Sequence, residues 1–103
     1  MVNKTAAKQL IEENISSNKV MVFSKSWCPY CKRAKDVIAG LYAQYATMEL
    51  DQRDDEDTMQ DVLLEMTGGR SVPRVFINGK FVGGCDETLK LHAKGMLIKL
   101  IQA

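Results

Sequence analysis

A β-hairpin near the end of the chain is the clearest structural signal in the sequence. Asn78-Gly79 separates two short apolar segments, residues 74–77 and 80–83. Asn-Gly favours a two-residue turn because both central positions of a type I′ turn need a positive φ. The sequence therefore predicts two antiparallel strands joined by a tight turn, and both strands have to lie in one sheet.

The segment before the hairpin alternates helical and strand patterns. An apolar run at residues 20–23 precedes apolar residues at helical spacing from Cys31 to Leu41, and residues 47–50 form a second strand candidate. A strand, a helix and a strand in succession imply parallel pairing with a right-handed crossover. Further helical patterns cover residues 7–15, 59–66 and 89–100, and the last of them is interrupted near Gly95.

These elements predict one domain over residues 1–103. A parallel pair extended by an antiparallel hairpin gives an α/β fold, a four-stranded mixed sheet with helices on both faces. Residues 54 and 55 are candidate caps for the third helix, and Gly68-Gly69 closes it. The acidic run at residues 51–57 is expected to be a solvated loop and helix start.

Composition excludes several classes of function. The net charge of +1 argues against a general nucleic-acid-binding protein. No apolar run reaches the length of a membrane span, and the start of the chain lacks the apolar segment of a secretory signal. We expect a monomer that acts in the cytoplasm, with neither nucleic acid nor membrane as a partner.

Two cysteines lie two residues apart in Cys28-Pro29-Tyr30-Cys31, between the first strand and the following helix. Proline suits the first helical position, because the N–H that it lacks would be unpaired there. Cys28 then lies where the helix N–H groups and dipole favour a thiolate. We expect Cys28 to be exposed and nucleophilic, and Cys31, one turn further on, to be buried and protonated. Such a pair beside a strand–helix–strand unit is typical of a thioredoxin-like fold.

Two other roles of the cysteine pair are weaker. The chain has three cysteines and no secretory signal, and in a reducing compartment a close pair is more often catalytic or metal-binding than structural. A zinc site needs four ligands, and Cys85 and His92 would have to complete it with a spacing unlike a usual zinc knuckle. We therefore expect a redox-active dithiol and no metal. His92 is expected to be a half-buried packing residue.

Three motifs taken together resemble the dithiol glutaredoxins: Cys28-Pro29-Tyr30-Cys31, residues 67–77, and Gly83-Gly84-Cys85-Asp86. The resemblance covers nearly the whole chain in order and spacing, although Ser71 stands where Thr is more usual before Val-Pro. It implies an enzyme that reduces protein–glutathione mixed disulfides and some protein disulfides. Glutathione would be its electron donor and co-substrate.

The resemblance also implies how glutathione, a tripeptide with a net negative charge, would be bound. Lys25 would bind the glycyl carboxylate, with Gln60 as a second partner. Val72 would pair its backbone with the cysteinyl residue of glutathione, because the family proline at Pro73 follows a cis peptide bond.

The remaining site residues follow the hairpin or flank the nucleophile. Gly84 would allow a close approach of backbone to ligand, and the helix beginning at Asp86 would hold the γ-glutamyl carboxylate, with the Asp86 side chain on the ammonium group. Tyr30 would lie at the edge of the bound ligand, and Cys85 is expected to be a small packed residue beside the ligand. Two arginines, Arg70 and Arg74, are expected only to solubilise their loop.

Two alternative functions stay open. A thioredoxin would take its electrons from a flavoprotein reductase instead of glutathione. A dimer could carry an iron–sulfur cluster on two Cys28 thiolates and two glutathione molecules, although Pro29 and Tyr30 make the loop less open than in the Cys-Gly-Phe-Ser type used for clusters.

Overall fold

A four-stranded mixed sheet forms the centre of the molecule. The structure is a computed structural model that describes residues 3–103, so the first two residues of the predicted domain lie outside the described part. The sheet has the order β2-β1-β3-β4, with β1 parallel to β2 and antiparallel to β3, and β3 antiparallel to β4. The strands are β1 (Val20–Ser24), β2 (Ala46–Glu49), β3 (Arg74–Ile77) and β4 (Lys80–Gly83). The predicted parallel pair and hairpin are both confirmed.

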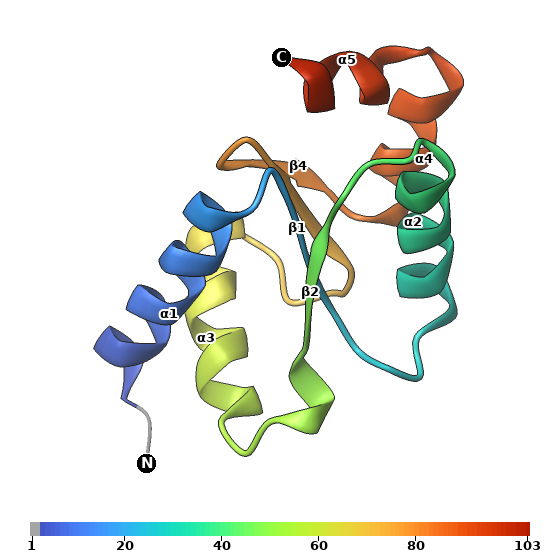
Figure 1. Ribbon diagram of the computed structural model, residues 1–103. Coiled ribbons are helices and arrows are strands. Elements are labelled where there is room, and N and C mark those ends of the chain that lie inside the picture. Colours follow the sequence, from blue (N-terminus) through green and yellow to red (C-terminus); the bar gives the residue numbers. More distant parts are fainter. Residues whose placement is uncertain (1–2) are drawn as a thin grey trace.

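Helices cover both faces of the sheet (Figure 1). One face carries α1 (Lys4–Ser17) and α3 (Glu56–Thr67). The other carries α2 (Pro29–Gly40), α4 (Cys85–Ala93) and α5 (Met96–Gln102). A 3-10 turn, η1 (Leu50–Gln52), joins β2 to α3. No helix within residues 3–103 is both long enough and apolar enough to cross a bilayer.

The two faces of β1 build two separate cores. Met21 and Phe23 point toward α1 and α3, where Phe23 meets Phe76 edge-on with ring centroids 5.7 Å apart. Val20 and Val22 point the other way, into the core beneath α2 and α5. Every residue of β1 is buried, because helices cover both sides of this central strand.

Local details differ from the sequence prediction at two places. The second strand ends at Glu49, because Leu50 already begins the 3-10 turn. Asp55 occupies the N-cap position of α3, but its side chain does not cap the helix. Its carboxylate instead accepts a 2.7 Å hydrogen bond from Arg53 Nε. The interruption near Gly95 is confirmed, since Gly95 has a φ of 70° and separates α4 from α5.

The end of α3 gives a prediction about stability. Gly68 has a φ of 80° and its N–H donates to the Leu64 carbonyl, whereas Gly69 has no positive φ. A methyl group on either glycine would meet no atom of residues 3–103 within 4 Å beyond the adjoining chain. Gly68→Ala should therefore lower the free energy of unfolding by about 1 kcal/mol through backbone strain alone. Gly69→Ala should leave it unchanged or raise it slightly. Urea unfolding measures both, and equal losses would contradict the assignment.

Candidate active site

The cysteine pair lies where β1 turns into α2. Cys28 is the N-cap of α2 and Pro29 is its first residue, as the sequence predicted. The Cys31 N–H donates to the Cys28 sulfur at 3.3 Å. The sulfur therefore lies at the positive end of the helix dipole, with a backbone donor that stabilises an anion.

The two thiols differ in burial, although less than expected. Cys31 is fully buried, but Cys28 is also only 7% exposed, so the prediction of an exposed Cys28 is wrong. The reason is the segment before β3, whose Val72 carbonyl oxygen lies 4.0 Å from the Cys28 sulfur. Burial, followed by the hydrogen bond to Cys28, raises the pKa of Cys31 to about 12. The Cys31 thiol is therefore protonated at neutral pH.

A groove of about 350 Å³ has Val72 in its lining, and the Val72 carbonyl oxygen is the atom that lies 4.0 Å from the Cys28 sulfur. Three segments that are far apart in the sequence meet in it: the start of α2, the segment before β3 and the start of α4. Its lining includes Tyr30, Ser71, Val72, Pro73, Gly84, Cys85, Asp86 and Glu87. Most of the predicted ligand-binding residues thus share one groove, and Glu87 is an addition that the sequence analysis missed.

Backbone geometry brings the walls of this groove together. The Val72–Pro73 peptide bond is cis, as expected. A Cβ on Gly84 would lie 3.3 Å from the Pro73 carbonyl oxygen, so glycine allows the two segments to approach closely. α4 begins at Cys85, one residue earlier than predicted, with Gly84 as its N-cap. The N–H groups of this helix start therefore lie at the groove and suit an anionic ligand.

Lys25 and Gln60 do not line the groove. The Lys25 ammonium lies 3.2 Å from the Glu56 carboxylate and 5.8 Å from the centroid of the Trp27 ring. Gln60, one turn after Glu56 in α3, is buried, and its side-chain oxygen has no hydrogen-bond partner within residues 3–103. Their predicted contacts with glutathione stay predictions.

The acidic run at residues 51–57 was expected to be solvated, and this is wrong for Asp55, which pairs with Arg53, and for Asp51 and Glu56, which hold the loop that carries Lys25. Asp51 accepts hydrogen bonds from the Ser26 N–H, at 2.8 Å, and from the Ser26 hydroxyl. These bonds lower the pKa of Asp51 below its usual value. Glu56 pairs with Lys25. Neither contact has a signal in the sequence, because each joins segments that only the folded sheet brings together.

Arg74 was expected to solubilise its loop, and this prediction is wrong. The side chain is buried at the start of β3, and its Nε donates to the Gly69 carbonyl at 3.1 Å. Burial lowers its pKa to about 10. Arg74 therefore ties together the loop from Gly69 to Pro73 that faces Cys28. Arg70, by contrast, is half-exposed and pairs with Asp61 at 2.7 Å.

A cluster of polar side chains lies one helical turn beyond Cys31. Lys35, one turn after Cys31, lies 2.9 Å from a Glu49 carboxylate oxygen and 3.3 Å from the Ser24 hydroxyl, which donates to the other Glu49 oxygen at 2.6 Å. The charge of Lys35 acts to lower the pKa of Cys31, against the larger effect of burial. This cluster has no signal in the sequence, because its members come from three different elements.

Cys85 and His92 are the residues that a zinc site would need beside the cysteine pair. Cys85 is buried and burial raises its pKa, as expected for a packed thiol. His92 is exposed, and the expectation of a half-buried residue is wrong. Within the described residues, no three side chains of His, Cys, Asp or Glu are grouped so that they could hold a metal ion.

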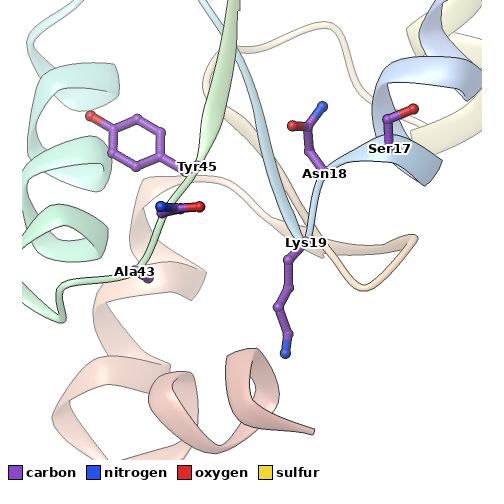
Figure 2. Close-up of a pocket in the computed structure, with 6 residues that line it drawn as sticks. Ser17, Asn18, Lys19, Ala43 and Tyr45 are labelled. Carbon is purple, nitrogen blue, oxygen red and sulfur yellow. The ribbon is translucent and has the colours of Figure 1, made fainter.

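A larger hollow of about 510 Å³ lies at the opposite end of β1, between the end of α1 and the segment before β2 (Figure 2). Lys19 and Tyr45 belong to its lining. Five strand residues, or roughly 16 Å, separate it from the thiol end of β1. Its lining contains no thiol, whereas Cys85 lines the smaller groove.

Known proteins resemble this chain over nearly its whole length. Residues 20–82 match the family model described as Glutaredoxin. A glutaredoxin of Vernicia fordii is 49% identical over 90 residues, which are 87% of this chain and 86% of that one. Oxidized glutaredoxin 2 from Chlamydomonas reinhardtii superposes with a TM-score of 0.92 at 50% identity, covering 98% and 95% of the two chains. The buckwheat glutaredoxin–glutathione complex gives a TM-score of 0.93 at 43% identity, covering 96% and 90%. These likenesses confirm the predicted thioredoxin-like fold.

The burial of Cys31 predicts its reactivity. In a Cys28→Ser/Cys85→Ser variant, Cys31 is the only remaining thiol of the three. Because burial is the largest cause of its raised pKa, its alkylation by iodoacetamide should accelerate about tenfold for each pH unit up to about pH 10, without a plateau. Mass spectrometry measures the rate, and circular dichroism checks the fold at each pH. A plateau below about pH 9 would contradict the assignment.

Proposed function

The chain belongs to the glutaredoxin family, and on this premise we propose that it is a glutathione-dependent thiol–disulfide oxidoreductase. It reduces protein–glutathione mixed disulfides, and also protein disulfides, through Cys28 and Cys31. One observation carries the proposal: the Cys28 sulfur lies at the start of α2 and 4.0 Å from the Val72 carbonyl oxygen, beside a groove of about 350 Å³. The buckwheat relative is described as a complex with glutathione, which supports the same ligand here.

The cysteinyl and γ-glutamyl parts of glutathione have counterparts in this groove, and the glycyl part extends beyond it toward Lys25. The cysteinyl backbone pairs with the N–H and C=O of Val72, in the manner of a one-residue strand addition. The γ-glutamyl carboxylate binds the N–H groups at the start of α4, and Asp86 binds the ammonium group. The glycyl carboxylate binds Lys25, with Gln60 as the second partner. The groove volume falls within the usual range of small-molecule sites.

The reduction of a protein–glutathione disulfide needs Cys28 alone. The Cys28 thiolate attacks the glutathione sulfur, a Cys28–glutathione disulfide forms, and the target protein leaves as a thiolate that takes up a proton. A glutathione thiolate then attacks the glutathione sulfur held by Cys28. Oxidised glutathione leaves, and Cys28 returns as a thiolate. A sulfur stabilised as an anion serves both as nucleophile and as leaving group in these exchanges.

The reduction of a protein disulfide needs both thiols. Cys28 attacks first and forms a mixed disulfide with the target, and Cys31 then attacks the Cys28 sulfur and releases the reduced protein. The resulting Cys28–Cys31 disulfide is reduced by two glutathione molecules, which become oxidised glutathione. The order follows from the pKa of Cys31, which burial raises most, and which the hydrogen bond to Cys28 and the negative charge of Cys28 raise further. Both disappear once Cys28 is in a disulfide, so Cys31 loses its proton more readily at the step that needs it.

The proposal extends to the setting of the reaction. The protein acts as a monomer in the cytoplasm, where glutathione keeps thiols reduced. A glutathione donor is preferred over a flavoprotein reductase because the groove beside Cys28 offers a helix start and a carboxylate, Asp86, for the two charged ends of a γ-glutamyl group.

The division of labour between the thiols gives the next prediction. Cys31→Ser should retain at least about half of the glutathione mixed-disulfide reductase rate, since that cycle uses one thiol, and should lose the reduction of protein disulfides. Cys28→Ser should lose both activities. The assay couples the formation of oxidised glutathione to NADPH consumption by glutathione reductase. Full reduction of protein disulfides by Cys31→Ser would refute the division of roles, and turnover by Cys28→Ser would refute the proposed function.

The electron donor is tested separately. Wild-type protein with glutathione and glutathione reductase should turn over, and with thioredoxin reductase and NADPH it should not. The opposite result would identify a thioredoxin instead.

A further inference from the structure

Lys25 is not a free cation in this structure. Its ammonium lies 3.2 Å from the Glu56 carboxylate, and the two side chains are only 24% and 33% exposed. The Trp27 ring lies on another side, 5.8 Å from the ammonium. The cation expected to bind the glycyl carboxylate of glutathione is therefore already paired with a carboxylate of the protein itself.

The position of Glu56 makes this pairing persistent. Glu56 is the first residue of α3, where the helix dipole stabilises a negative side chain. Asp51, the other acidic residue that contacts this loop, has both carboxylate oxygens engaged by Ser26. The Lys25 charge also acts on Asp51, but Glu56 is the carboxylate that forms an ion pair with the ammonium and so stands closest to a ligand bound there.

A ligand carboxylate that binds Lys25 is attracted by the ammonium group and repelled by the Glu56 carboxylate. The ammonium has three donors, so it can contact Glu56 and a ligand together. Its single positive charge is already balanced, however, and a ligand carboxylate bound to it comes close to the Glu56 carboxylate. At such short range the repulsion is similar in size to the attraction, and partial burial limits its screening by water.

We propose that Glu56 is a specificity-determining residue that weakens recognition of the free glycyl carboxylate of glutathione. The inference rests on the proposed function and specifies its substrate class. Wild-type protein discriminates little between glutathione and derivatives whose glycyl carboxylate is neutralised as an ester or amide. Removal of the Glu56 charge creates a preference for the free acid.

Binding without turnover gives the most direct experiment. Trp27 is the single tryptophan of the chain and lies beside Lys25, so its fluorescence reports occupation of this site. S-methylglutathione and its glycyl ethyl ester, which cannot exchange disulfides, are titrated against wild type and Glu56→Gln. In Glu56→Gln, the Kd of the free acid should fall about three- to tenfold, and that of the ester should change less than about twofold. This increase in affinity for the free acid should be smaller in about 0.5 M NaCl, because salt screens the charges.

Asp57→Asn is the matched control. Asp57 also lies in the first turn of α3 and is exposed, and it forms no ion pair with any residue of the described chain from 3 to 103. The control loses the same charge and the same favourable interaction with the helix dipole, but no contact with Lys25. Its Kd for the free acid should change less than about twofold. If the Kd of the free acid fell equally in both variants, the effect would come from net charge and the proposal would be overturned.

Turnover separates this inference from the proposed function. With a glutathione–peptide disulfide as substrate, Glu56→Gln should lower KM, because removal of the charge strengthens binding of the glycyl carboxylate. An unchanged or raised Kd in Glu56→Gln, or an equal gain with the ester, would overturn the role of Glu56. Failure of the proposed function would appear differently, as absence of Cys28-dependent turnover in the wild type.

Discussion

The antiparallel register between β1 and β3 determines where the reactive groups of this protein meet. Phe23 lies opposite Arg74, so the residues that follow β1 and the residues that precede β3 emerge at the same edge of the sheet. The first segment leads to Cys28 and the second contains Val72 and the cis peptide bond before Pro73. The hairpin places Gly83 opposite Val75, and the next residue, Gly84, lies close to the Pro73 carbonyl oxygen. A shift of this register would separate the thiol from its groove even if every strand and helix still formed.

Features with a strong local cause could be predicted from the sequence. Asn78-Gly79 forms the turn of the hairpin, Pro29 begins α2, and Gly95 divides the last helical stripe. Each depends on backbone preferences that neighbouring residues largely decide. The cis bond at Pro73 and most of the groove lining came instead from resemblance to a family, since no local rule assigns a ligand site to a Val-Pro pair.

Long charged side chains could not be predicted in the same way. Arg74 looks like a surface residue in the sequence, but its position in β3 buries it, and its guanidinium satisfies a carbonyl of the preceding loop. Glu56 looks like one of several solvated acids, but α3 lies close enough to the Cys28 loop for it to pair with Lys25. Such partners depend on the tertiary arrangement, because a flexible side chain can reach any of several elements that pack near it.

The loop from Lys25 to Cys28 has to satisfy two requirements that oppose each other. The residues from Lys25 to Cys28 need a defined position, since the Cys28 sulfur serves chemistry only when it lies both at the helix start and beside the groove. Asp51 and Glu56 supply that order from outside the loop, and both do so with negative charge. Negative charge near the loop opposes an anionic ligand and the thiolate alike. Asp51 directs both of its oxygens to Ser26, whereas Glu56 pairs with Lys25, the cation that an anionic ligand would need. Order in the loop and affinity for the glycyl carboxylate are therefore coupled through Glu56. The reactive sulfur of Cys28 is stabilised from the other side of the loop by the dipole of α2 and the Cys31 N–H.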